Sequence, residues 1–214
     1  MTVFKCKMCG GNLEVSEGSS VATCEYCGTK QTIPTSSDEE IVNLFNRANY
    51  LRLKCEFDKA ADTYERILEL DNTQAEAHWG IVLCKYGVEY VEDKKALFDD
   101  ERKPTCHRTQ MESILSDADY QATLDNADSA AAEIYKLQAR EINDLQKKIL
   151  DVVKNEAPYD VFICYKERDE KGQRTQDSVI ANDIYHELTE SGLKVFYAAI
   201  TLEDKLGEEY EPYI

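Results

Sequence analysis

Four of the eight cysteines in this 214-residue chain form two pairs with the same internal spacing. Cys6 and Cys9 make the first pair, Cys24 and Cys27 make the second, and a glycine follows each pair. Four thiolates arranged in this way can complete a tetrahedral shell around zinc, and a closed shell leaves no position open for catalysis. We therefore predict a structural Zn²⁺ site, because a module of about thirty residues buries too little apolar surface to fold without metal.

Short runs of β-forming residues flank both cysteine pairs, and this segment, residues 1–35, resembles a zinc ribbon. Such a module could recognise nucleic acid or protein, or could serve only as a folded cap. A nucleic-acid surface needs clustered basic side chains, but the three lysines here are balanced by three glutamates, and the whole chain has a formal net charge of −17. We expect a structural or protein-contact role and no nucleic-acid partner. A redox-active use of the cysteine pairs is the less favoured alternative.

The last part of the chain has the pattern of a strand, a helix and a second strand. The apolar run Tyr159–Lys166 predicts a buried parallel strand. A helix follows, with Ile180, Ile184 and Leu188 in one row at a spacing of four residues. Residues 193–197 predict the second strand, so the segment is expected to be a βαβ unit with a right-handed connection.

The amino-acid sequences of these segments resemble those of one protein family. Tyr159–Lys166, with the letters YDVFICYK, is similar to the first signature box of Toll/interleukin-1 receptor (TIR) domains. Residues 202–214 resemble the loop and the opening helical turn that follow the second strand in bacterial TIR domains. The resemblance implies that residues 158–214 are the N-terminal part of a flavodoxin-like α/β domain, so we expect the chain to be a fragment of a longer protein. In NAD-cleaving members a glutamate in that opening turn is essential, and Glu211 matches it.

The reaction implied by the resemblance would give Glu211 a definite role. Nicotinamide leaves NAD as a neutral group, so positive charge develops on the ribose, and a fixed carboxylate beside the ribose would stabilise it. Lys166 or Arg168 could contact the phosphates, since ligands bind at the carboxyl ends of parallel strands. Phe196 and Tyr197 could flank the nicotinamide or adenine ring. The competing interpretation of Glu211 is an acidic helix start without catalysis.

Between these two modules the pattern is mostly helical. Residues 38–95 resemble tetratricopeptide hairpins, and the competing interpretation is a plain helical hairpin in a spacer. The predicted packing positions of one repeat are Ala48, Leu51, Ala60, Tyr64 and Ile67.

Residues 96–155 are expected to form further helices after a loop at 98–109. Cys106 and His107 lie in that loop and are expected to be unliganded. A heptad-like helix over 127–154 could dimerise or pack against neighbouring helices, and packing is favoured because the seam is short.

The sequence thus predicts a multi-domain chain: a small β zinc ribbon, an all-α region and the first βαβ part of a TIR domain. It shows no signal peptide and no run of the eighteen or so apolar residues that a membrane helix needs, so we expect a cytoplasmic protein without a membrane partner. The favoured function is bacterial-type signalling or defence, with NAD cleavage when TIR domains self-associate and the helical region senses a protein partner. The alternative is a non-catalytic adaptor that acts through TIR–TIR contacts.

Overall fold

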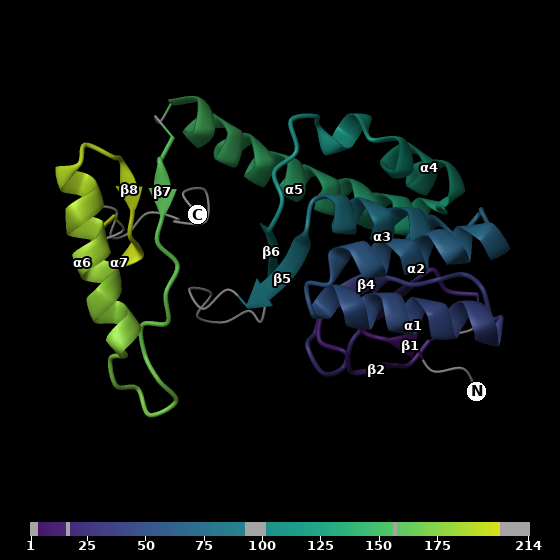
Figure 1. Ribbon diagram of the computed structural model, residues 1–214. Coiled ribbons are helices and arrows are strands. Elements are labelled where there is room, and N and C mark those ends of the chain that lie inside the picture. Colours follow the sequence, from purple (N-terminus) through teal and green to yellow (C-terminus); the bar gives the residue numbers. More distant parts are fainter. Residues whose placement is uncertain (1–3, 16–17, 93–101, 156–157, 202–214) are drawn as a thin grey trace. The chain divides into compact units, whose positions relative to one another are not determined.

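Helices and two-stranded sheets follow one another along the chain (Figure 1). The chain divides into two compact units, Met1–Lys147 and Lys148–Ile214. This layout agrees with the predicted mixture of small β modules and helices, while the four domain boundaries and their family identities stay predictions. The computed structural model describes residues 4–15, 18–92, 102–155 and 158–201.

The N-terminal segment forms two antiparallel hairpins, and each hairpin carries one cysteine pair in its turn. A backbone hydrogen bond from the amide of Gly10 to the carbonyl of Cys6 closes the first turn at 2.8 Å, and Gly28 donates to Cys24 in the same way. Both glycines have positive φ, 78° and 67°, which explains why glycine follows each pair. The strands are β1 (Phe4–Lys5), β2 (Asn12–Leu13), β3 (Val21–Thr23) and β4 (Lys30–Thr32).

Three helices lie side by side in the first unit and pack against one another: α1 (Glu39–Leu53), α2 (Phe57–Leu70) and α3 (Ala75–Lys85) (Figure 1). The Asp38 carboxylate caps α1 by accepting hydrogen bonds from two backbone amides of its first turn. The five predicted packing positions of the repeat are all buried or half-buried in one apolar cluster. A repeat and a plain hairpin would both bury these residues, so the tetratricopeptide identity stays a prediction.

The loop predicted at 98–109 is wrong for residues 102–106, while residues 98–101 lie outside the described residues. Residues Arg102–Cys106 form strand β6, which pairs antiparallel with β5 (Val88–Glu92). Pro104 suggested a loop because proline cannot donate a ladder hydrogen bond, but a two-stranded sheet consists of edge strands, where proline is tolerated.

The long helix predicted over 127–154 is present as α5 (Ser129–Asn155). Tyr135 and Ile142 of the predicted seam are buried in the core cluster that contains Trp79. The Trp79 and Tyr135 ring centroids are 5.5 Å apart, and Trp79 Nε1 donates to Oε1 of Gln138, a third seam residue, at 3.1 Å. This part of the heptad-like seam therefore packs inside the first unit, as the packing alternative predicted. A short 3₁₀ helix, η1 (Ile114–Ser116), and α4 (Ala118–Asn126) precede it.

The second unit contains the predicted βαβ unit, but its first strand is confined to two residues and is not buried as predicted, since Phe162 is 52% exposed. β7 (Val161–Phe162) pairs parallel with β8 (Val195–Phe196), and α6 (Gln176–Glu190) connects them. Gly192, with a φ of 85°, ends the helix as a C′ glycine. The short helix α7 (Ala198–Thr201) follows β8.

Candidate metal centre

The four sulfur atoms of the two cysteine pairs lie together, all within 4.8 Å of one another. The Sγ atoms of Cys6 and Cys27 are 3.7 Å apart, as are those of Cys9 and Cys24. A disulfide would hold two sulfurs at about 2.05 Å, and all four cysteines are free. The hairpins therefore bring together four thiols that could hold a metal ion, as the spacing predicted.

Hydrogen-bond donors surround two of these sulfurs. The side-chain amide of Gln31 donates to Cys6 Sγ at 2.9 Å, and the backbone amide of Met8 donates to the same atom at 3.4 Å. Burial opposes ionisation of Cys27, but hydrogen bonding to the side chain and backbone of Thr29 and to the neighbouring thiols lowers the pKa of Cys27 to about 7. The partners of Cys27 thus favour its thiolate form, which is the form that binds metal. Burial has the opposite effect on two other members of the cluster: it raises the pKa of Cys24 and raises that of Cys9 to about 12.

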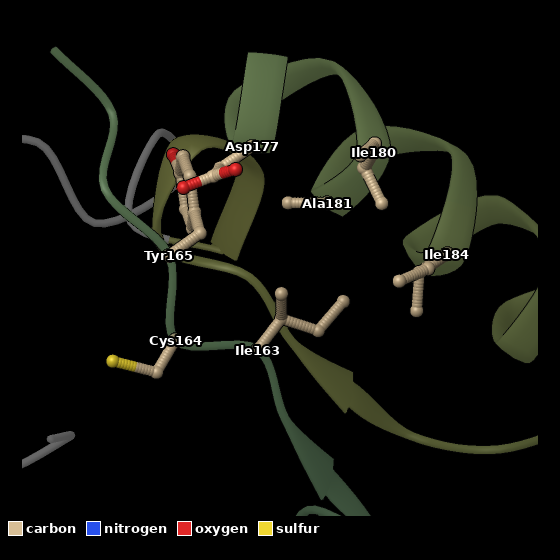
Figure 2. Close-up of a pocket in the computed structure, with 7 residues that line it drawn as sticks. All are labelled: Ile163, Cys164, Tyr165, Asp177, Ile180, Ala181 and Ile184. Atoms are coloured by element: carbon tan, nitrogen blue, oxygen red, sulfur yellow. The ribbon is translucent and has the colours of Figure 1, made fainter. Parts of the chain in front are cut away.

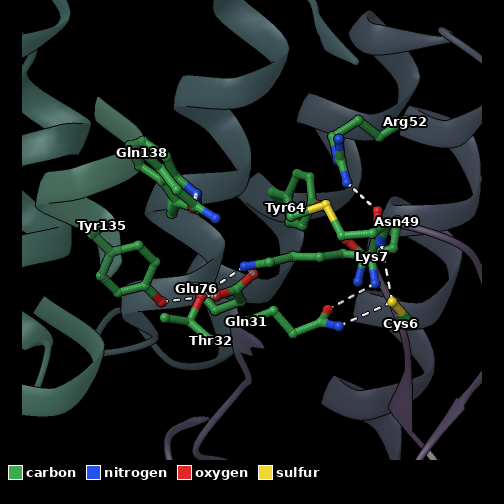
Figure 3. A network of polar contacts seen from close by, with 12 residues as sticks. Cys6, Lys7, Gln31, Thr32, Asn49, Arg52, Tyr64, Glu76, Tyr135 and Gln138 are labelled. Carbon is green, nitrogen blue, oxygen red and sulfur yellow. Dashed lines mark hydrogen bonds and ion pairs between the residues drawn. The ribbon is translucent and has the colours of Figure 1, made fainter. Parts of the chain in front are cut away.

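Lys7 lies inside the first cysteine turn, and its side chain extends away from the sulfurs into the core (Figure 3). The side chain is 3% exposed, and its ammonium lies 2.7 Å from Glu76 Oε1 and 2.6 Å from Thr32 Oγ1. The other carboxylate oxygen of Glu76 accepts hydrogen bonds from the Thr32 hydroxyl at 2.6 Å and the Tyr135 hydroxyl at 2.8 Å. Burial lowers the pKa of Lys7, and the nearby carboxylate counteracts part of that effect.

The backbone of Lys7 is held as firmly as its side chain. Its amide donates to Gln31 Oε1 at 3.0 Å, and its carbonyl accepts a hydrogen bond from Arg52 Nη2. Arg52, which is 2% exposed, also donates from Nη1 to the carbonyl of Val88 at 3.2 Å. This buried network, formed by Lys7, Thr32, Arg52, Glu76 and Tyr135, connects the cysteine hairpins to α1, α3, α5 and β5.

Sequence reasoning missed this network, because it counted Lys7 only as a basic residue balanced by acids. One signal was available: Glu76 stands in the first turn of a helix that is otherwise mainly apolar. A carboxylate there could be interpreted as a helix-dipole partner, and nothing local indicated that its cation would come from the segment with the cysteine pairs.

A second candidate site lies at the carboxyl end of β7, where a pocket opens between that strand and α6. Figure 2 shows Ile163 directed toward the helix and Cys164 directed away from it. Most of the lining is apolar, and Asp177 is its one acidic group. The lining residues are Ile163, Cys164, Tyr165, Asp177, Ile180, Ala181 and Ile184.

None of the four predicted NAD-contact residues is among the residues that line this pocket. Lys166 and Arg168 are exposed in the segment after β7, where Arg168 Nη1 donates to the carbonyl of Gly172 at 2.9 Å. Phe196 and Tyr197 are each 1% exposed. The contact roles of these four residues stay predictions.

Aromatic rings enclose both buried side chains. Phe196 stacks on Phe162 at a centroid distance of 4.7 Å, and Tyr197 packs between Tyr165 and Tyr185. The predicted catalytic residue, Glu211, lies outside the described residues.

No family model matches this chain, and no curated protein or solved structure is significantly similar to it. The resemblance to TIR domains therefore rests on the residues of the chain itself. Within the described ranges, every helix is too short or too polar to cross a membrane.

Proposed function

We propose that this chain is part of an NAD-cleaving signalling or defence protein of the TIR type, in which the first unit acts as a zinc-stabilised sensing and protein-interaction module. The observation that carries the proposal is the parallel pairing of β7 with β8 through α6. The segment that resembles the first TIR signature box thus forms a parallel strand, as the first strand of such a domain would. We also propose a cytoplasmic location, because all eight cysteines are outside disulfides, as is usual in a reducing compartment.

The metal of the four-cysteine cluster is proposed to be Zn²⁺ in a structural role. Four sulfurs at the usual zinc–sulfur distance of about 2.3 Å form a tetrahedron with edges of about 3.8 Å. The two sulfur pairs separated by 3.7 Å fit that edge length. A bound zinc would supply folding free energy to the hairpins, and the network around Lys7 would transmit this rigidity to the helices.

The proposed chemistry in the second unit is the loss of nicotinamide from NAD. The Glu211 carboxylate would stabilise the positive charge that develops on the ribose. Lys166 and Arg168 follow β7 and are exposed, so their side chains are available to neutralise the dinucleotide phosphates. Nicotinamide departs as a neutral molecule, so the reaction requires no general acid.

A non-catalytic adaptor is the second candidate function, and one observation favours it. The second unit exposes large apolar side chains on α6, with Val179 58%, Ile180 48% and Ile184 42% exposed. Exposed apolar side chains that adjoin one another often mark a protein contact. In this alternative, TIR–TIR association through such surfaces would be the whole function.

The test is the release of free nicotinamide by the full-length gene product, measured beside Glu211→Ala and the matched control Glu209→Ala. We expect release from the wild type and the control and none from Glu211→Ala. Equal release from all three would remove Glu211 from the mechanism. No release from any of them, with oligomers present in solution, would favour the adaptor; Ile184→Glu should then abolish the oligomers.

A further inference from the structure

We propose that Cys55, Glu89 and His107 form a second metal site, which binds a divalent transition ion such as Zn²⁺ through one thiolate, one carboxylate and one imidazole. The site is separate from the four-cysteine cluster and from the proposed NAD chemistry. The sequence analysis predicted no partner for His107, because Glu89 and Cys55 are 18 and 52 positions away from it in the sequence.

Three different segments of the first unit bring these side chains together. Cys55 follows α1, Glu89 lies in β5 and His107 follows β6. Glu89 stands opposite Thr105 in the hairpin register, and a residue two positions beyond Thr105 lies on the same face of the strand. The amide of His107 donates to the carbonyl of Gly87 at 2.9 Å, which extends the pairing far enough to hold the imidazole beside Glu89.

Arg52 fixes the position of Cys55 relative to Glu89 and His107. It lies in the last turn of α1, three residues before Cys55, and its hydrogen bond to the carbonyl of Val88 ties the end of the helix to β5. The same guanidinium is buried in the network around Lys7. The end of α1, which precedes Cys55, and strand β5, which carries Glu89, are therefore tied together by a residue of the core.

The distances between the donor atoms suit a metal ion. His107 Nε2 is 2.8 Å from Glu89 Oε2, and Cys55 Sγ is 3.7 Å from that oxygen and 3.9 Å from that nitrogen. A point equidistant from three atoms separated in this way lies about 2.0 Å from each, and zinc binds nitrogen and oxygen at about 2.0–2.2 Å and sulfur at about 2.3 Å. An ion slightly out of the plane of the three atoms would reach all of them with little movement.

The backbone at Cys55 is a second and independent observation. Its φ is 56°, and it is the one non-glycine residue with positive φ in the described ranges. It occupies the C′ position of α1, where glycine is usual because a side chain is strained in this conformation. A cysteine in that place, with its sulfur directed at a histidine and a carboxylate, is consistent with strain retained for a functional side chain.

The three ligands also match the charge of a divalent ion and leave it a path of entry from solvent. One thiolate and one carboxylate together balance a divalent cation, and binding would release the thiol proton. The side chains of His107 and Glu89 are 45% and 36% exposed, so an ion can enter from solvent, and three protein ligands leave a fourth tetrahedral position for water. The Phe57 ring packs on the His107 ring at 5.5 Å and limits its rotation.

The simpler interpretation is that His107 and Glu89 form a hydrogen-bonded pair with Cys55 nearby and that no metal binds. Measuring the number of zinc ions bound per chain distinguishes this interpretation from a metal site. The full chain is loaded with Zn²⁺, freed of excess metal by gel filtration, and assayed for zinc per chain. We expect two ions for the wild type and one for Cys55→Gly, a change that removes the ligand but suits the positive φ. Cys164→Ser, which changes an exposed cysteine of the second unit, is the matched control and should keep two.

Competition with a chromophoric chelator then tests the other ligands. His107→Gln and Glu89→Gln should each weaken the second zinc at least about tenfold, since even partners outside the coordination shell are worth 10–100-fold. A wild-type chain that holds one zinc, or a Cys55→Gly chain that keeps two, would overturn the site. The readout is metal content, so this outcome is independent of whether the protein cleaves NAD.

Discussion

Replacing Lys7 with methionine is expected to destabilise the first unit by about 3 to 4 kcal/mol at pH 7, because it leaves the Glu76 carboxylate buried without a cation. Glu76 is 5% exposed and would keep only the two neutral donors, Thr32 and Tyr135. Methionine has nearly the length of the lysine stem, so the packing around it should change little. Removing one partner of a buried ion pair costs about 3–5 kcal/mol in proteins.

Proton uptake sets an upper limit on this loss. An unpaired buried carboxylate can avoid its charge by binding a proton, and protonating a free glutamate costs about 3.7 kcal/mol at pH 7 but only about 1 kcal/mol at pH 5. The deficit of Lys7→Met relative to the wild type should therefore shrink by about 2 to 3 kcal/mol between these two pH values.

Urea unfolding followed by tryptophan fluorescence measures this effect in the relevant unit. Trp79 is the one tryptophan of the chain and is fully buried in the first unit. The matched variant is Lys7→Met/Glu76→Gln, which removes both charges and should recover most of the lost stability. A deficit below about 1 kcal/mol at pH 7, or a double variant as unstable as the single one, would refute the assignment of this pair.

Five further outcomes can be checked, and four of them need only the same fluorescence signal. The Tyr90 hydroxyl is buried without a hydrogen-bond partner among the described residues, so Tyr90→Phe should raise the free energy of unfolding by about 1 kcal/mol. Tyr135→Phe should lower it by about 1.5–3 kcal/mol, because the variant loses a hydrogen bond to a carboxylate. A Cβ on Gly80 would lie 2.5 Å from the Tyr64 ring, so Gly80→Ala should cost about 1–3 kcal/mol instead of the gain of about 1 kcal/mol expected in an open helix. Burial raises the pKa of Tyr64, Tyr90 and Tyr135. Because the folded state then holds these phenolic protons more tightly, the contribution of the three tyrosines to stability should be constant up to about pH 10 and be lost above it. Cys24→Ser should lose the zinc that we propose for the four-cysteine cluster, as measured by a metal assay. It should also shift Trp79 emission to the red, since Cys24 and Trp79 belong to the same core cluster.

Several features could be predicted because their causes are local. The cysteine spacing predicted the four-thiol cluster, since each pair lies within one tight turn and needs only a second turn of the same kind. The apolar run from Tyr159 and the row of helical isoleucines predicted the βαβ unit, which the parallel pairing of β7 and β8 confirms. The long helix over 127–154 was visible from its periodicity, and only its limits moved by one or two residues.

The tertiary structure alone decided which polar groups meet. Lys7 and Glu76 are 69 positions apart, and Cys55 and His107 are 52 apart; neither pairing has a period or spacing that a sequence pattern could reveal. The strand at 102–106 was hidden for a related reason, because Pro104 forbids an interior strand but not the edge position that the β5 partner supplies. Local sequence determines turns, helices and strands through backbone preferences, whereas partners for buried charges and metal donors are set by the packing that brings distant segments together.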